Sequence, residues 1–298
     1  MNYPVVCFGE ILWDILPGNI VPGGAPMNVA YHLQQLGIRP GLITRVGLDN
    51  YGKKLIQLME KQGISTDYFQ MDFELDTGKV TVSQGEGDTM NYEFCHPVAW
   101  DNIQWDDNFV SLVAGSRYFI YGSLGARSEA SRKVLYRLLE VAPSRVLDIN
   151  LRPPHYDRRT LEHLLRGVGL LKLNLDELEL LTGWFAGPTS EADRMQALQA
   201  RFAIPIVVVT RGSRGAVLLA EGAFYEHPGF SVELADTVGS GDAFLAGLLF
   251  KMTQGTDPPG AIEFASAMGA LVASHHGPTP AYRTEEIRRL IEGGARKI

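Results

Sequence analysis

The sequence has few cysteines and no long hydrophobic run. Only Cys7 and Cys95 occur among 298 residues, too few for a disulfide framework and too far apart for a CxxC metal site. The longest apolar run, residues 243–250, is far too short to span a bilayer, and the N-terminus lacks the basic segment of an export signal. These absences predict reduced thiols and a cytoplasmic location, with no membrane partner.

The sequence also lacks concentrated positive charge and several catalytic motifs. Its net charge is −7 without a long run of Lys or Arg, which argues against nucleic acid as a partner. HExxH, GxSxG and GxGxxG are absent, so a zinc site of that type, a hydrolase nucleophile and a dinucleotide-binding turn are not indicated. Residues 47–54 match GxxxxGK[ST] until Lys54, which replaces the hydroxyl that a P-loop needs for Mg²⁺. We therefore exclude a P-loop NTPase.

What the sequence does contain is an alternation of strand and helix patterns in a chain with 45% apolar and 20% charged residues. Short β-branched runs predict strands at 5–8, 42–44, 118–121, 146–149, 170–173 and 206–210. Helical periodicity falls between most of them, at 26–36, 51–62, 128–141, 175–181, 191–202, 242–253, 259–274 and 284–291. This order predicts an α/β fold with a mostly parallel sheet, helices on both faces and a single domain over residues 1–298.

Two segments break the alternation. Residues 9–22 and 77–100 alternate polar and apolar positions, the second of them around a turn at 85–88. We expect these segments to form a small antiparallel flap outside the main sheet and within the same domain. Because exposed strand edges tend to be covered, the flap also favours a homodimer.

The segment Gly239-Ser240-Gly241-Asp242 stands directly before an apolar run that is expected to be a buried helix. Unpaired N–H groups at a helix start attract an anion, and the glycines allow a phosphate to approach the main chain. Asp242 would repel that phosphate, so its presence fits a base acting on an acceptor hydroxyl. The alternative is a glycine turn with Asp242 capping the helix. Local chemistry alone leaves both interpretations open.

Two further clusters follow predicted strands. Gly24 belongs to a Gly pair before a predicted helix, and Asn28 lies in that helix's first turn. The amide of Asn28 and the carboxylate of Asp14 suit sugar hydroxyls. Taken singly, each is more often a turn or cap residue, and their position after strand ends is what favours a ligand contact. Asn174 and Glu177 share one helix face and carry oxygens suited to Mg²⁺ or its waters. Taken alone, that pair reads better as a capping box.

In order and across nearly the whole chain, these clusters resemble the ribokinase-like PfkB family of carbohydrate kinases. The resemblance rests on Gly23-Gly24 with Asn28, Asn174 with Glu177, Thr210-Arg211-Gly212 with Gly215, and residues 236–244. It implies a three-layer αβα domain with a small β lid, and transfer of phosphate from ATP to a hydroxyl of a sugar or nucleoside.

The resemblance also implies roles for single residues. By motif, Asp242 is the base and Gly239, Ser240 and Gly241 form the anion hole. The remaining roles are Asn174 and Glu177 for Mg²⁺ and phosphate, Thr210, Gly212 and Gly215 for the nucleotide, Asp14, Gly24 and Asn28 for the sugar, and Asp236 and Val238 for a potassium ion.

Within that family, residues 98–101, 121–128 and 148–153 look most like bacterial fructokinases. A fixed Arg152 can donate several hydrogen bonds to sugar hydroxyls. However, Asn150-Leu151-Arg152 also resembles 2-keto-3-deoxygluconate kinases, whose acidic substrate would pair with the same guanidinium. We expect an ATP-dependent fructokinase. The alternatives are a 2-keto-3-deoxygluconate kinase, another sugar or nucleoside kinase of the family, or a non-catalytic sugar- or nucleotide-sensing relative.

Overall fold

The computed structural model describes residues 3–294 except 17–18, 85–89, 186 and 188–189. Its internal contacts divide the chain into two compact units, Met1–Pro143 and Ser144–Ile298. We describe each unit in turn. No helix in the described part of the chain is both long and apolar enough to cross a membrane.

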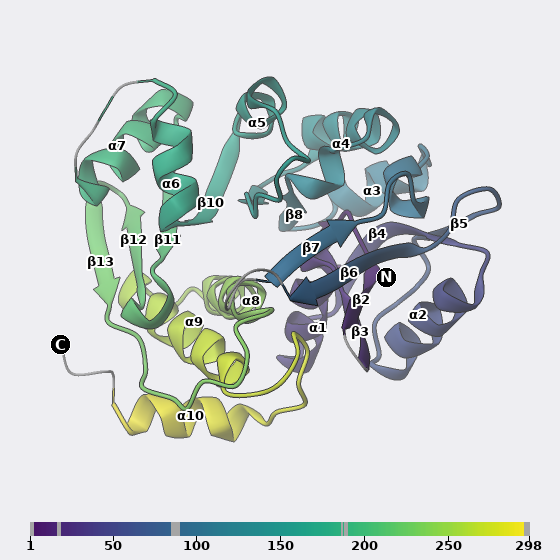
Figure 1. Cartoon of the computed structure of the whole chain (residues 1–298). Helices are drawn as coiled ribbons and strands as arrows, with labels where there is room; N and C mark the ends of the chain where they lie inside the picture. Colours follow the sequence, from purple (N-terminus) through teal and green to yellow (C-terminus); the bar gives the residue numbers. More distant parts are fainter. Residues whose placement is uncertain (1–2, 17–18, 85–89, 186, 188–189, 295–298) are drawn as a thin grey trace. The chain divides into compact units, whose positions relative to one another are not determined.

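A parallel sheet forms the centre of the first unit (Figure 1). Its strands lie in the order β8-β1-β4-β5 and are β1 Val5–Phe8, β4 Pro40–Gly47, β5 Phe69–Asp72 and β8 Tyr118–Gly122. Every residue of β1 and β8 is buried, as expected for strands covered on both faces, and this explains their uninterrupted apolar sequences. Helix α1, Ala25–Gln35, packs on β1, β4 and β8. The other helices are α2 Asn50–Lys61, α3 Asn108–Ala114 and α4 Glu129–Val141.

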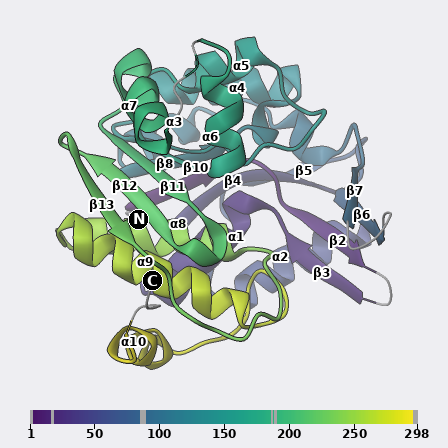
Figure 2. The ribbon, with the colours of Figure 1, turned by 60° about the vertical axis from the view of Figure 1, so that its left-hand side comes forward.

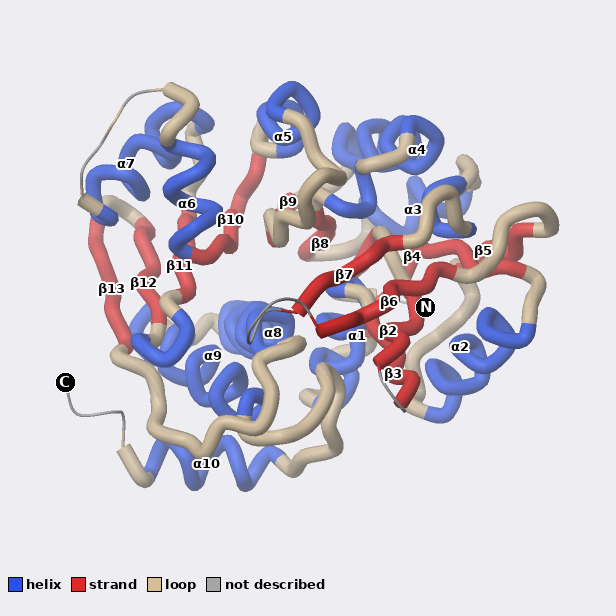
Figure 3. Tube along the Cα trace, viewed as in Figure 1, coloured by secondary structure: helices blue, strands red, loops and turns tan. Residues whose placement is uncertain are grey.

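A separate four-stranded sheet occupies the stretches where the flap was expected (Figure 3). Its strands, in the order β3-β2-β6-β7, are β2 Leu12–Leu16, β3 Asn19–Gly23, β6 Gly78–Gln84 and β7 Met90–Phe94. Two antiparallel hairpins meet through β2 and β6, which run parallel. The prediction of a wholly antiparallel flap is therefore wrong at this pair, because the two hairpins enter the sheet in the same direction. The predicted turn at 85–88 lies outside the described residues.

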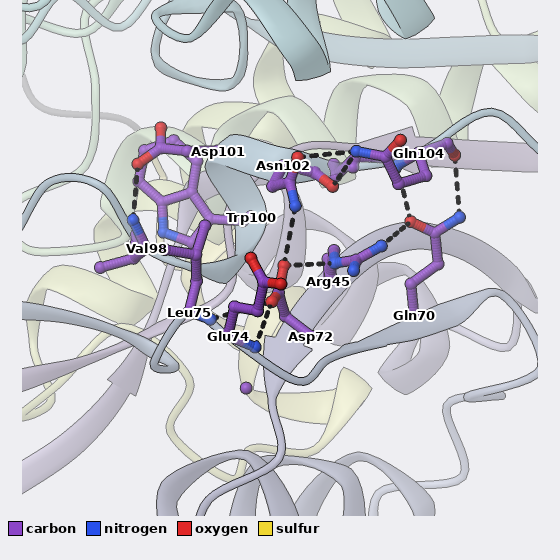
Figure 4. A network of polar contacts seen from close by, with 12 residues as sticks. Arg45, Gln70, Asp72, Glu74, Leu75, Val98, Trp100, Asp101, Asn102 and Gln104 are labelled. Carbon is purple, nitrogen blue, oxygen red and sulfur yellow. Dashed lines mark hydrogen bonds and ion pairs between the residues drawn. The ribbon is translucent and has the colours of Figure 1, made fainter.

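A polar network anchors the edge of the first unit's main sheet (Figure 4). Arg45 on β4 donates to the buried carboxylate of Asp72 on β5 at 2.8 Å. Asp72 also accepts from the Asn102 amide at 3.0 Å and from the backbone N–H groups of Glu74 and Leu75, each at 2.9 Å. Asn102 ends the 3₁₀ turn η1, Ala99–Asn102. One carboxylate thus links two strands and a connecting segment.

The second unit has a mixed sheet in the order β13-β12-β11-β10-β9. Its strands are β9 Arg145–Asp148, β10 Val168–Asn174, β11 Ile206–Thr210, β12 Ala216–Ala220 and β13 Ala223–His227. Strands β9 to β11 are parallel, whereas β12 and β13 form an antiparallel hairpin that the sequence analysis did not predict. Its two-residue turn is Glu221-Gly222, with φ of 53° and 77°. Glu is not a residue that usually signals this turn, which favours Asn or Asp before Gly.

Six helices of the described second unit surround that sheet (Figure 2). They are α5 Arg158–Leu164, α6 Leu175–Thr182, α7 Glu191–Phe202, α8 Ser240–Thr253, α9 Pro258–Ala273 and α10 Thr284–Glu292. α6 contacts β10 and β11 and α7 contacts β11, whereas α9 contacts β12 and β13 and packs extensively on α8. α8 is buried from Asp242 to Leu249, as its uniformly apolar sequence predicts. It begins at Ser240, two residues before the predicted start.

Candidate active site

The start of α8 presents an unpaired backbone donor. Gly239 is the N-cap, in the left-handed conformation with φ 77°, and no side chain caps the helix. The N–H of Gly241 donates to no described residue, whereas the N–H of Ser240 donates to the Thr237 carbonyl at 3.3 Å. Asp242 lies in the first turn and is buried. The capping alternative is therefore wrong, because the cap is Gly239 and not Asp242.

A cavity of about 430 Å³ opens beside this helix start. Ser240 and Gly241 line it together with Thr210, Gly212 and Gly215, so the structure brings two of the predicted anion-hole residues and three of the predicted nucleotide residues around one space. Gly239, Asn174 and Asp242 are not among its lining residues. Its other walls are mainly apolar or carry hydroxyls, and include Phe230, Leu234, Phe244, Ser266, Ala270 and Ala273. Apolar walls suit a flat base and glycines allow phosphates to approach the main chain, so this lining fits a nucleotide.

Asn174 and Glu177 form the capping box of α6. The Asn174 side chain accepts from the Glu177 N–H at 2.9 Å, and Glu177 Oε2 accepts from the Asn174 N–H at 2.8 Å. Glu177 Oε1 accepts from the N–H of Leu151 at 2.8 Å. Asn174 pairs in register with Thr210 across β10 and β11. The capping function is therefore real, and the same carboxylate also fixes the segment that leads to Arg152.

The sequence analysis missed a buried ion pair beneath the helix start. Lys172 Nζ on β10 lies 3.0 and 2.9 Å from the two carboxylate oxygens of Asp148 at the end of β9. A Cβ added at Gly241 would lie only 2.9 Å from the same Nζ. Burial alone would lower the pKa of Lys172, but the nearby carboxylates of Asp148, Asp242 and Glu177 outweigh it and the pKa is raised. The available signal was one Lys inside the apolar strand 168–173.

The residues that suggested which sugar is the substrate differ in their exposure to solvent. Arg152 is exposed, and its guanidinium donates to the Leu151 carbonyl at 3.0 Å. In the first unit, Arg127 instead donates to Asp101 at 2.7 Å and stacks 4.0 Å above the ring of the buried Trp100. Arg127 and Trp100 thus pack against each other, with Arg127 Nη1 and Trp100 Nε1 left without a hydrogen-bond partner among the described residues, whereas Arg152 is exposed to a ligand.

Three predicted sugar contacts lie near the start of α1 in the first unit. Gly24 is its N-cap with φ 114°, and a Cβ there would collide with the Glu10 carbonyl. The carboxylate of Asp14 on β2 lies against Gly23, and the buried Asn28 donates its N–H to the Gly24 carbonyl at 2.9 Å. Buried Glu10, which the sequence analysis did not single out, accepts from the Ala25 N–H at 3.3 Å. This end of α1 therefore gathers oxygen-bearing side chains around a glycine turn.

The loop before Gly239 is tied to the end of α9. Asp236 accepts from the N–H groups of Val238 at 3.0 Å and Gly277 at 3.1 Å. The Ala273 carbonyl accepts from the Asp236 N–H at 3.2 Å, and a Cβ at Gly239 would lie 2.5 Å from Pro278. Each carboxylate oxygen of Asp236 thus accepts one backbone hydrogen bond within the protein.

Comparison with known proteins agrees with this geometry. The pfkB family of carbohydrate kinases matches residues 18–285. Fructokinase-1 of Zea mays is 30% identical, over 97% of this chain and 97% of its own length. A solved fructokinase with bound ATP from Xylella fastidiosa has a TM-score of 0.87 at 22% identity, covering 98% of this chain and 99% of its own. The fructokinase of Vibrio cholerae O395, in a form with fructose, ADP and calcium ion, has a TM-score of 0.82 at 25% identity, with 97% and 99% covered.

The match to the family covers most of the chain, and the similarity to solved structures extends over nearly all of it. The ribokinase-like α/β fold predicted from the motif order is confirmed by that similarity. The predicted enzyme class, a carbohydrate kinase, is confirmed by the family match. The chain belongs to the pfkB family of carbohydrate kinases.

Proposed function

We propose that this protein transfers the γ-phosphate of ATP to a hydroxyl of fructose. The observation that carries the proposal is the start of α8, where the unpaired N–H of Gly241 and the carboxylate of Asp242 share one helical turn beside the cavity. ATP as donor is supported by the apolar residues and glycines that line the cavity. Fructose as acceptor is supported by the name of the Zea mays relative and by the fructose-bound Vibrio cholerae neighbour.

In the proposed reaction, Asp242 accepts the proton of the sugar hydroxyl as its oxygen forms a bond to the γ-phosphorus. The bond between that phosphorus and the bridging oxygen breaks, and ADP leaves. The N–H of Gly241, at the positive end of α8, donates to the transferred group where negative charge accumulates. Asp14, Gly24 and Asn28 are proposed to bind the sugar, and the flap of β2, β3, β6 and β7 to exclude water during transfer.

Mg²⁺ fits this site as an ion carried by the nucleotide. Both oxygens of Glu177 already accept backbone hydrogen bonds, and the described residues contain no group of three His, Cys, Asp or Glu side chains able to hold a metal. Mg²⁺ commonly keeps several waters and binds through substrate phosphates, so Glu177 and Asn174 would reach it through water. When bound, the ion neutralises charge on the β- and γ-phosphates.

A panel of acceptors tests the proposal. Fructose, 2-keto-3-deoxygluconate, ribose, a nucleoside and a phosphosugar are compared by kcat/KM in a coupled assay of ADP release with MgATP. Fructose is expected to rank first. If it ranks last, the proposed acceptor is wrong, and if no acceptor releases ADP, the kinase activity itself is wrong.

The second candidate substrate is 2-keto-3-deoxygluconate, which is favoured by Arg152. This guanidinium forms no ion pair with any described residue and is exposed, so it can pair with an acidic acceptor. Replacing Arg152 by Gln should reduce kcat/KM for the acid more than for fructose. An equal reduction for both would remove this argument for the acidic substrate.

Three further expectations stay predictions. A homodimer formed through the flap would appear in sedimentation at micromolar protein. Potassium activation through the loop of Asp236 and Val238 would appear as a rise in kcat when potassium replaces sodium. A cytoplasmic location is testable by fractionation.

A further inference from the structure

The second unit places a buried lysine–carboxylate pair beneath the first turn of α8. Lys172 is buried in the sheet, and both of its short contacts are to Asp148. Asp242 and Glu177 lie close enough to raise the pKa of Lys172 together with Asp148. The lysine is therefore a buried cation that is paired with Asp148 and influenced by the charges of Asp242 and Glu177.

Lys172 lies so close to Gly241 that a side chain at 241 would force its ammonium to shift. Any side chain at 241 would begin 2.9 Å from Nζ, closer than real Cβ contacts. The N–H of Gly241 belongs to the cavity wall, and the lysine lies beneath the same residue. The backbone of Gly241 thus lies between the proposed phosphate position and the Lys172 ammonium.

The desolvation cost of a buried ion pair of this kind argues against a role in stability alone. Burying two charges removes their hydration, and an apolar pair of similar size is often as stable. Lys172 is the one residue in β10 between Val168 and Leu173 with a charged side chain, and its neighbours Leu171 and Leu173 are fully buried. Packing alone does not account for a lysine in such a strand, whereas its proximity to the first turn of α8 suggests a functional role.

We propose that Lys172, clamped by Asp148, is a positioning residue for phosphoryl transfer that acts through Asp242 and the first turn of α8. Its ammonium offsets the mutual repulsion of Asp242, Glu177 and Asp148, and so holds the base in place. It also adds positive charge behind the N–H of Gly241, where negative charge on the transferred group is stabilised. This role rests on the proposed kinase function and adds a residue to it.

The test removes the charge without leaving an unpaired ion. The double variant Lys172→Gln with Asp148→Asn replaces the ion pair by two amides that can hydrogen-bond to each other. With an acceptor that the parent phosphorylates, kcat is expected to fall roughly 10- to 100-fold, as for other residues that act through a neighbour of the reacting atoms. KM for ATP should stay within about 3-fold of the parent, because the variant loses no contact that binds ATP equally in the ground state and the transition state. The thermal midpoint should stay close to that of the parent.

A matched control and the single variants complete the design. Lys133 and Glu129 form an exposed pair on α4 at 2.6 Å, and Lys133→Gln with Glu129→Gln should leave kcat unchanged. Lys172→Gln alone should lower the thermal midpoint, because Asp148 is left buried and unpaired. A double variant with parental kcat overturns the proposal, as does one whose KM for ATP rises in step with the loss of kcat. A parent without kinase activity refutes the proposed function instead, so the two failures are distinguishable.

Discussion

At the scale of single residues, the two glycines before Asp242 exclude a side chain for different reasons. Gly239 has a positive φ and faces the backbone of Pro278, which cannot move aside easily. Gly241 faces the end of the Lys172 side chain, and its helical conformation is open to any residue. Gly239 is therefore required by the conformation of the loop. Gly241 is required by its position between the cavity and the Lys172 ammonium.

Alanine at these two positions should separate stability from activity. Gly239→Ala should lower the free energy of unfolding by about 1–3 kcal/mol, because it forces a left-handed conformation on a residue with a Cβ. Gly241→Ala should reduce kcat with a smaller effect on stability, because it displaces the Lys172 ammonium. Urea denaturation and steady-state kinetics of both variants check this. Equal losses of stability would contradict the distinction.

Replacing Asp242, the proposed base, should nearly abolish turnover while leaving ATP binding intact. Asp242→Asn keeps the size of the side chain in the first turn of α8 but cannot accept the hydroxyl proton as a carboxylate does. We expect kcat to fall on the order of 10² to 10⁴-fold, with the Kd for ATP little changed. Calorimetry with ATP and a coupled ADP assay measure the two quantities. Retention of most of the parental kcat would refute the assignment.

At the scale of elements, Asp72 connects β4, β5 and η1, and its titration should be visible in stability. Although burial opposes ionisation, hydrogen bonds from Asn102, Leu75 and Glu74 and the charge of Arg45 lower the pKa of Asp72 to about 2. A carboxylate with a lowered pKa in the folded state stabilises above its unfolded pKa of about 4, and this contribution is lost as pH falls towards 2.

Asp72→Asn should therefore cost about 2 kcal/mol at neutral pH, and its difference from the parent should shrink between about pH 4 and pH 2. Urea titrations followed by circular dichroism across this range measure it. Asp76→Asn is the control, because Asp76 is 72% exposed and lies 3.6 Å from Lys79, a surface pair expected to contribute little. A constant difference at all pH values would mean that Asp72 acts by packing alone.

Helix α9 supplies one wall of the cavity, and filling that wall should compete with the nucleotide. Ala270 lines the cavity and is partly exposed to it. Ala270→Phe should raise KM for ATP by at least about 10-fold, because a loss of roughly 1.4 kcal/mol of binding is tenfold. KM for the sugar should change less. An unchanged KM for ATP would show that the nucleotide does not occupy this space.

Most elements with a clear apolar pattern were predicted from the sequence, including the flap that departs from the strand–helix alternation, whereas β5, α3 and α5 were missed. The buried strand β11 and the helix α7 were predicted with the observed bounds because apolar runs and caps mark them. The hairpin of β12 and β13 was missed, since its Glu221-Gly222 turn carries a weak signal. In the site, motif residues such as Gly241 and Thr210 were found, whereas Lys172 is recognisable only when its partner from β9 is known.

At the scale of the whole molecule, ligand binding should raise the temperature at which the chain unfolds. A ligand at 100 times its Kd stabilises the folded protein by about 2.7 kcal/mol. MgATP should therefore raise the thermal midpoint, whereas NAD should not, since no dinucleotide motif follows β1. Scanning fluorimetry with each ligand measures this. A shift with NAD alone would contradict the kinase assignment.

The loop before α8 is fixed in large part by a later segment of the chain. Asp236 hydrogen-bonds to Ala273 and Gly277, and Gly239 lies against Pro278. A chain that ends before residue 273 contains every residue of the Gly-Ser-Gly-Asp turn and lacks these contacts. Truncation there should therefore abolish phosphate transfer although the turn itself is complete.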